Sequence, residues 1–130
     1  MWKLTPVFAL LLAPIASAIA QGPPPEDVEI VASIWCDTPD QLETVLRAHY
    51  ADKVPMQSAM AEINRNSPEA CVPARAIVKQ GAEIRRFTTG DVIVAVRAAQ
   101  VHGIMRGPYA LMMRPQTWYT VKVVAELTPL

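Results

Sequence analysis

The chain has 130 residues, of which 52% are hydrophobic and 18% charged, and its 12 basic side chains equal its 12 acidic ones. This length suits one domain rather than several. The balanced charge excludes the strongly basic or acidic classes that bind nucleic acid or anionic membranes through net charge.

The first twenty residues have the pattern of a secretory signal peptide. Lys3 supplies a positive charge, a mostly apolar segment follows over residues 4–20, and small residues stand at Ala18 and Ala20. The segment contains two prolines and is shorter than the roughly 20 apolar residues of a spanning helix. We therefore expect cleavage after Ala18 or Ala20. The mature chain would be periplasmic or secreted and would keep no stable membrane anchor.

Residues 21–27 read Gln-Gly-Pro-Pro-Pro-Glu-Asp, and residues 28–130 are expected to form one domain. Three consecutive prolines have no backbone donors for a sheet, so 21–27 is expected to be a flexible leader. Residues 28–35 then alternate, with apolar side chains at every even position from Val28 to Ile34. This pattern predicts a strand with that face buried and Trp35 packed at its end, against the helices.

Two helices are expected after this strand. Thr38 and Gln41 form a capping box, and Pro39 suits the first helical position, so a helix starts here and ends near residue 52. Pro55 opens a second helix, which the Ser67-Pro68 break ends. Together they form a helical hairpin.

The two cysteines, Cys36 and Cys71, bracket this hairpin. In an oxidising compartment two cysteines are most simply one disulfide. A reactive thiol is the first alternative, but the oxidising compartment would convert two facing thiols to a disulfide. A zinc site with His49 and His102 is the second, but its spacings match no compact zinc pattern. The sequence predicts a structural Cys36–Cys71 disulfide and no metal.

The pattern changes to strands after the hairpin. Gly81 is expected to form a hairpin turn between strands at 74–80 and 84–88. The further strands are expected at 92–101 and 118–127, and residues 109–113 are a candidate for a short edge strand in addition. The predicted class is α+β, a helical hairpin packed on a strongly curled antiparallel sheet of about five strands, in the order β-α-α-β-β-β-β. The sheet would approach a small barrel or, alternatively, form a flatter two-layer sandwich with the helices.

Catalytic signatures are missing from the sequence. It has no G-x-S-x-G elbow, no H-E-x-x-H helix and no glycine-rich phosphate loop, so no catalytic residue and no cofactor is assigned. The basic residues Arg85 and Arg86 are adjacent and point to opposite faces of a strand, which favours ordinary ion pairs with Glu83 or Glu69. A small exported hydrolase remains an alternative if residues such as Asp37, His49 and His102 converge only in the fold.

Aromatic and sulfur side chains near the C-terminus give the last indication. Trp118 falls on the outward parity of the final strand, and Tyr109, Met112 and Met113 precede it. These four residues would either form an apolar partner surface or cover the end of the sheet. The resulting hypothesis is a non-catalytic binding or accessory domain of the cell envelope. Its partner would be another envelope protein or a polymer, and not nucleic acid.

Overall fold

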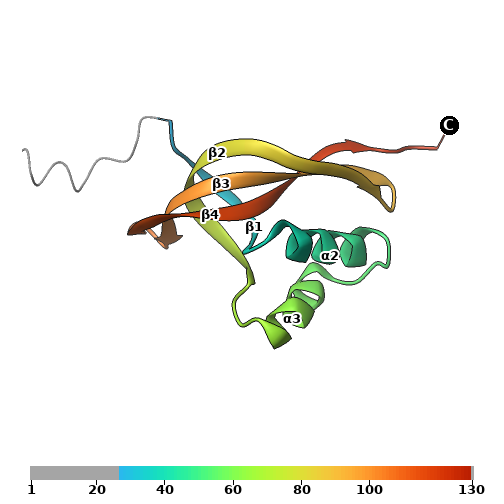
Figure 1. Ribbon diagram of the computed structural model, residues 1–130, viewed down its shortest axis with the longest axis horizontal. Coiled ribbons are helices and arrows are strands. Elements are labelled where there is room, and N and C mark those ends of the chain that lie inside the picture. The colour runs from blue at the N-terminus through green and yellow to red at the C-terminus, as the bar shows by residue number, and fades with distance from the viewer. Residues whose placement is uncertain (1–26, 130) are drawn as a thin grey trace, which may run out of the picture.

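The computed structural model describes residues 27–129. The expected signal peptide and all but the last residue of the proline-rich leader lie outside this range. The elements in chain order are β1 (Glu29–Cys36), α2 (Pro39–Tyr50), α3 (Met56–Asn66), β2 (Cys71–Thr89), β3 (Val92–Arg106) and β4 (Tyr109–Glu126). The α+β class and the helical hairpin are confirmed. The sheet has four strands rather than five, in the order β-α-α-β-β-β (Figure 1).

All strand pairs are antiparallel, and the sheet closes on itself in the order β1-β2-β3-β4. The closing seam is short, because β1 meets β4 only where Trp35 faces Thr120 and Cys36 faces Tyr119. Hydroxyl groups reinforce it. The oxygens of Ser33 and Thr120 lie 2.6 Å apart, and Thr120 also donates to the Ile34 carbonyl at 3.0 Å.

The expected hairpin turn at Gly81 is wrong, and this accounts for the missing fifth strand. β2 continues through Gly81 as one long bent strand with register shifts against β3 between Gln80 and Arg85. A Cβ atom at position 81 would lie 2.8 Å from the carbonyl oxygen of Ala98. Glycine therefore marks a close approach of two backbones within a strand, as it often does at bulges.

The strands β3 and β4 also run further than expected. β3 passes through Gly103, and β4 passes through Pro115, so the only turn between them is at Gly107-Pro108. The ladder between these strands is interrupted twice, at Val124 and at a larger bulge where three β4 residues around Arg114 have no partner in β3. This bulge lets the strand accommodate a proline, which cannot donate to a ladder.

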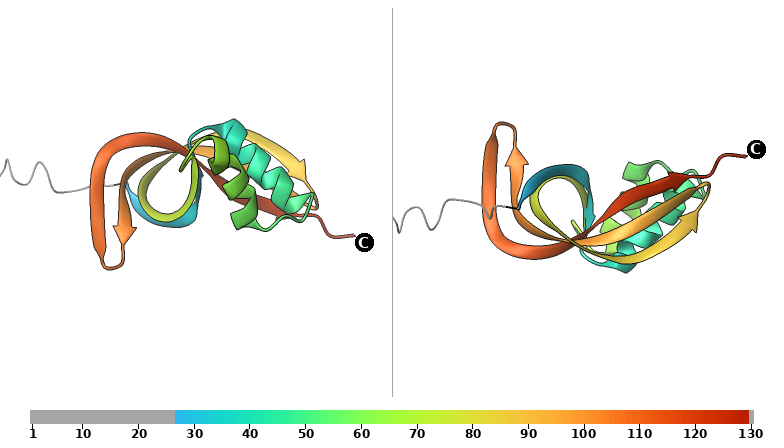
Figure 2. Two further views of the ribbon diagram at one scale, coloured as in Figure 1. Left: turned by 90° about the horizontal axis from the view of Figure 1, so that it is seen from below. Right: turned by 90° about the horizontal axis from the view of Figure 1, so that it is seen from above.

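The length of these strands creates two separate hydrophobic cores. One half of β3, with Val92, Val94 and Val96, packs under the helices. The other half, with Ala99 and Val101, lines the inside of the curl. Figure 2 shows the two halves side by side, the curled strands at one end and the helical hairpin over the sheet at the other.

The expected faces of β1 are reversed. Ile30 is 51% exposed, whereas Trp35 is fully buried inside the curl and not against the helices. The indole Nε1 of Trp35 donates to the Ala74 carbonyl at 3.0 Å. A closed sheet has an interior to fill, and the large tryptophan fills it in preference to the smaller residues of the even face.

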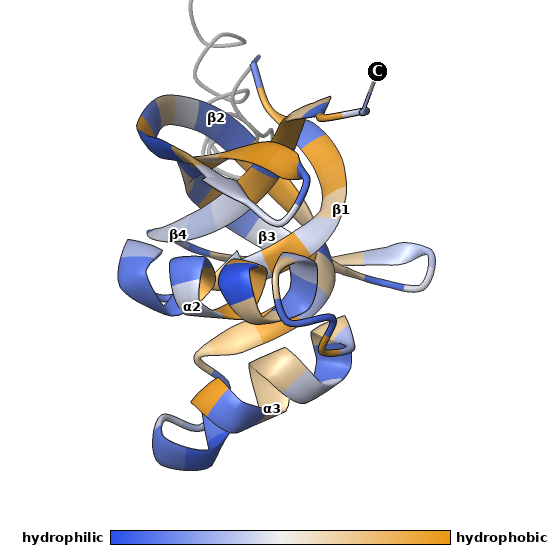
Figure 3. Ribbon diagram, turned by 90° about the vertical axis from the view of Figure 1, so that its right-hand side faces the viewer, coloured by the Kyte–Doolittle hydropathy of each residue, from blue (hydrophilic) through white to orange (hydrophobic). Residues whose placement is uncertain are grey.

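Both helices pack on the sheet through their apolar faces. α2 buries Leu42, Val45 and Leu46, and α3 buries Ala59 and Met60. The colouring by hydropathy shows hydrophobic stretches along the strands and hydrophilic ones on the outer parts of both helices (Figure 3). Such one-sided burial is how an amphipathic helix covers a sheet.

The predicted Cys36–Cys71 disulfide is present. The two cysteines are directly opposite each other in the β1–β2 ladder, with their Cα atoms 4.1 Å apart. Asn64 of α3 binds the same point, because its side chain both donates to the Cys71 carbonyl and accepts from the Cys71 amide at 2.8 Å. The root of the helical hairpin is thus tied to the sheet twice.

Candidate ligand site at the mouth of the curled sheet

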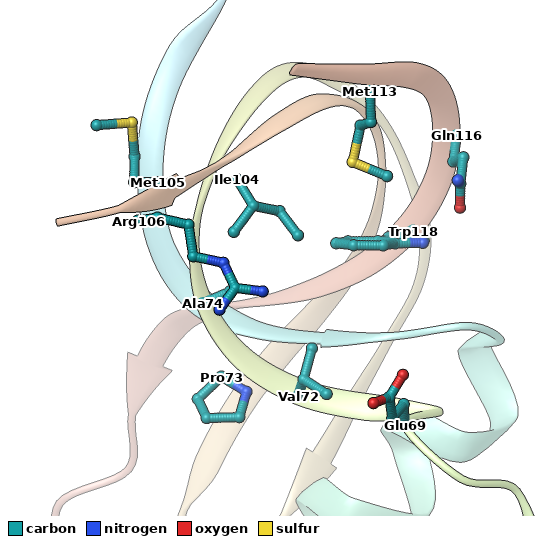
Figure 4. Close-up of a pocket in the computed structure, with 10 residues that line it drawn as sticks. All are labelled: Glu69, Val72, Pro73, Ala74, Ile104, Met105, Arg106, Met113, Gln116 and Trp118. Atoms are coloured by element: carbon teal, nitrogen blue, oxygen red, sulfur yellow. The ribbon is translucent and has the colours of Figure 1, made fainter. Parts of the chain in front are cut away.

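A hollow among the described residues lies at the mouth of the curl. It has a volume of about 460 Å³. Its walls come from three strands and the segment before β2, namely Glu69, Val72, Pro73, Ala74, Ile104, Met105, Arg106, Met113, Gln116 and Trp118 (Figure 4). Open mouths of β-barrels are common places for ligands.

The floor of this mouth cavity is apolar. Trp118 and Met113 are partly buried, and both pack against the inner core around Trp35 and Val101. In Figure 4 their side chains point toward Ile104 across the hollow. The indole and the thioether therefore close the end of the core and at the same time offer an apolar surface to a ligand.

Charge enters the cavity at two points. The guanidinium of Arg106 points into the hollow, and the carboxylate of Glu69 lies below Trp118 at the opposite side (Figure 4). Neither side chain has an ion-pair partner within 4.0 Å among residues 27–129. The cavity thus combines an apolar floor with a guanidinium on one side and a carboxylate on the other, and its Arg106 side suits a ligand that carries an apolar part and an anionic group.

The four residues predicted as a partner surface divide into two pairs. Trp118 and Met113 line the cavity, so the expected outward direction of Trp118 is wrong. Tyr109 and Met112 lie outside the cavity on the β3–β4 hairpin, where they are 75% and 47% exposed. Two of the four predicted residues therefore line the mouth cavity, and two do not.

The other walls were missed. Ile104 and Arg106 belong to β3, and Val72 to β2, and these strands meet β4 only through the curl. One feature of the sequence pointed to the β3 wall of the cavity. The stretch between Gly103 and Gly107 carries Ile104, Met105 and Arg106, which a continuous strand would align with the Tyr109 segment, but the glycines indicated breaks instead.

The residues considered for hydrolytic chemistry lie on three different elements. Asp37 is exposed in the turn before α2, His49 is near the end of α2, and His102 is buried in β3. The Nδ1 atom of His49 donates to the Val54 carbonyl at 2.8 Å, so this ring fastens the end of the helix. The fold therefore does not bring these side chains together in the mouth cavity.

Arg85 and Arg86 of β2 both form ion pairs, but only Arg86 takes a partner that the sequence indicated, Glu83. Arg85 binds Asp40 and Glu43 of α2 at 2.8 and 2.7 Å, and Arg86 binds Glu83. These bonds raise the pKa of both arginines, and the hydrogen bond from Arg86 lowers the pKa of Glu83. None of these residues lines the mouth cavity.

A smaller hollow of about 330 Å³ lies where β1 and β4 diverge beyond their seam. Arg97, the one charge in the middle of β3, lines this hollow and donates from Nη2 to the Gly81 carbonyl at 3.0 Å. Its Nε atom is buried and has no partner among the described residues. Arg97 supports the bent part of β2, and we assign this hollow a structural role.

The described residues contain neither a metal-binding cluster nor a membrane-spanning helix. Cys36 and Cys71 are joined to each other, so neither is a thiolate that could bind zinc. Within residues 27–129 no group of three or more His, Cys, Asp or Glu side chains is placed to hold a metal ion. No helix in this range is long and apolar enough to cross a membrane.

Comparisons of the chain with protein-family models, with curated proteins and with solved structures found no match. The functional argument therefore depends on the geometry of the mouth cavity.

Proposed function

We propose that this chain is a small exported binding or accessory domain of the cell envelope, periplasmic or secreted, and that its site is the mouth cavity. The observation that carries the proposal is the cavity itself. An indole face, a thioether and an isoleucine surround a free guanidinium in a hollow of about 460 Å³. This is the composition of a binding pocket, which is mostly apolar with a few convergent polar groups.

Two further features support export. The N-terminal pattern of Lys3, an apolar segment and Ala-x-Ala is that of a signal peptide. The disulfide Cys36–Cys71 is a bond that persists in oxidising compartments and is rare in the cytosol. Expression of the full chain in a bacterial host tests this part. We expect the periplasmic fraction to hold a chain that starts at residue 19 or 21 and has no thiol to alkylate. A chain that retains Met1 would contradict it.

The site is tested with anilinonaphthalene sulfonate, a fluorescent probe that carries one apolar ring system and one anionic group. Trp118 lies in the cavity and Trp35 lies beneath it, so binding should transfer excitation from tryptophan to the probe. We expect saturable binding to the folded mature chain. Arg106→Gln should weaken it by roughly tenfold, because the sulfonate loses its charge-assisted contact.

Two alanine-to-leucine variants, one inside the cavity and one outside it, test whether the probe binds in the cavity. Ala74 lines the hollow and is partly buried, so Ala74→Leu should occupy the space and abolish probe binding. Ala110→Leu makes the same change at an exposed position on the neighbouring hairpin and should leave binding unchanged. Equal binding by both variants would overturn the assignment of the site.

A further inference from the structure

The outer edge of β4 is open beside the mouth cavity. β4 pairs with β3 along its length, but it meets β1 only at Tyr119 and Thr120. Within residues 27–129, the edge from Tyr109 to Trp118 therefore has no neighbouring strand. A row of unpaired backbone N–H and C=O groups is a template for one more strand.

The side chains along this edge are apolar and exposed. Tyr109 is 75% exposed, Leu111 55% and Met112 47%. The hairpin that carries them stands away from the rest of the sheet in both views of Figure 2. Monomeric proteins seldom expose several large apolar side chains together unless the surface meets a partner.

The charged side chains on the hairpin that carries this edge are all basic, and the one carboxylate of the adjoining cavity, Glu69, lies on the side opposite Arg106. Arg106 and Arg114 flank it, and no acidic residue occurs between positions 106 and 116. Neither arginine has a carboxylate within 4.0 Å among the described residues. A second copy of this edge would place arginine near arginine, which disfavours pairing of the chain with itself. A partner that carries acidic side chains would neutralise both.

The edge also leads into the cavity. Met113 ends the apolar run of β4 and lines the hollow, and Arg106, which faces the start of that run across the β3–β4 turn, lines it too. Pro115 has no N–H to donate, so a continuous added ladder is confined to the stretch from Tyr109 to Met113. Alternate side chains of an added strand point to opposite faces, so one set can turn toward the hollow.

We propose that the β4 edge from Tyr109 to Met113 accepts an extended acidic and apolar peptide segment of a partner protein as an added strand, with an apolar side chain in the mouth cavity. The inference rests on the proposed function, since it names the chemistry of the ligand for the same site. Main-chain hydrogen bonds would provide affinity, and the cavity and the two arginines would provide selectivity.

Fluorescence anisotropy with labelled synthetic peptides tests this chemistry. The probe alternates valine and glutamate over about eight residues, within the usual length of a strand. Two matched peptides accompany it, one with lysine in place of glutamate and one with N-methyl groups along one edge to remove its backbone donors. We expect each matched peptide to bind the mature chain roughly tenfold more weakly or worse. Equal affinity of all three peptides would overturn the proposal.

Variants of the protein complete the test. Arg106→Gln combined with Arg114→Gln should weaken the acidic peptide by roughly tenfold or more. Arg75→Gln removes the same charge from an exposed position of β2 outside the cavity and should have no effect. Polyphosphate that binds as tightly as the acidic peptide would instead identify an anionic polymer as the ligand. A concentration-dependent dimer that is absent in the Tyr109→Glu variant would identify a second copy of this chain as the occupant of the edge. Either result would overturn the proposal.

The outcome for the edge is separable from that for the cavity. If the sulfonate probe binds in an Ala74-dependent way and no peptide does, the cavity stands and the added strand fails. If the peptide binds and the Ala74→Leu variant leaves the sulfonate probe unaffected, the proposed cavity site fails.

Discussion

Thr38 and Gln41 fix the start of α2 through two reciprocal hydrogen bonds. The Gln41 amide donates to the Thr38 hydroxyl, and the Thr38 amide donates to the Gln41 side chain, both at 3.1 Å. Each bond satisfies a donor that the first turn of a helix leaves free. The residues that make this cap were identifiable from the sequence because the motif is local and depends on no distant contact.

We predict that Thr38→Ala lowers the free energy of unfolding by about 1 kcal/mol, the usual effect of removing an N-cap. Urea denaturation of the mature chain measures it. Thr44→Ala is the matched control, because the Thr44 hydroxyl only donates back to the Asp40 carbonyl within the same helix. A loss as large in the control as in Thr38→Ala would refute the importance of the cap.

Substitutions at Gly90 and Gly107 distinguish the effect of backbone strain from the effect of steric overlap. Both have a left-handed backbone, with φ of 59° and 58°. A Cβ at Gly90 would overlap the main-chain carbonyl of Tyr50 at the end of α2, whereas a Cβ at Gly107 would meet no atom within 4 Å. The backbone of the turn between β2 and β3 is therefore in close contact with the end of α2.

We predict that Gly107→Ala costs about 1 kcal/mol of unfolding free energy, from backbone strain alone. Gly90→Ala should cost on the order of 3 kcal/mol, because backbone must also move. Thermal and urea unfolding of the two variants give the difference. Equal losses would mean that the contact between Gly90 and α2 has no energetic consequence.

At the scale of elements, Arg85 connects β2 to α2. Its guanidinium bonds two carboxylates of the helix, Glu43 at 2.7 Å and Asp40 at 2.8 Å. The hydrogen bond from Arg85, followed by that from Arg47, lowers the pKa of Glu43 below its ordinary 4.5. A carboxyl group with a lowered pKa stabilises the fold above its ordinary pKa, and that contribution is lost as the pH falls through the folded value.

We therefore predict that Glu43→Gln makes the unfolding free energy less dependent on pH in the acidic range. Between about pH 6 and about pH 3 the unfolding free energy of the wild type should fall more steeply than that of the variant. Glu126→Gln, which removes an exposed carboxylate without an ion pair in the described chain, should follow the wild type. Parallel curves for the wild type and Glu43→Gln would rule the linkage out.

The elements were predictable to different degrees for physical reasons. The helices carry their own boundary signals, as at Thr38 and Pro55, and both were correctly placed. The strands do not, because a bend and a break have the same sequence signature. Gly81 and Pro115 indicated ends, but long-range pairing carries β2 and β4 past both through bulges. The inward face of β1 was reversed because the curl, and not the alternation, decides which side is enclosed.

For the molecule as a whole, the disulfide is the strongest single constraint. It closes a loop that separates the cysteines by 35 residues. In the chain-entropy model a loop of this length stabilises the fold by about 4 kcal/mol. We predict that reduction of the mature chain lowers its unfolding free energy by up to this amount, as measured by urea denaturation with and without reductant. A Cys36→Ala, Cys71→Ala double variant should match the reduced protein and should not respond to reductant.

Only part of the mouth cavity was predictable, because its walls meet only through the closure of the whole sheet. Met113 and Trp118 are close in sequence and were named together as a surface. Arg106 and Val72 join them only because three strands curl around one axis. Closure of the sheet depends on a short seam at Trp35 and Cys36, and such a seam has no signature of its own.

The placement of the disulfide joins both ends of the helical pair at one point of the sheet. Cys36 and Cys71 are opposite residues of one ladder, so the sheet treats everything between them as an insertion at a single cross-link. A protease cut in the link between α2 and α3 would yield two fragments that remain attached through sulfur. A segment grafted in place of the helices would have to span the same 4.1 Å between its ends and also cover Val92, Val94 and Val96, which the helices now bury.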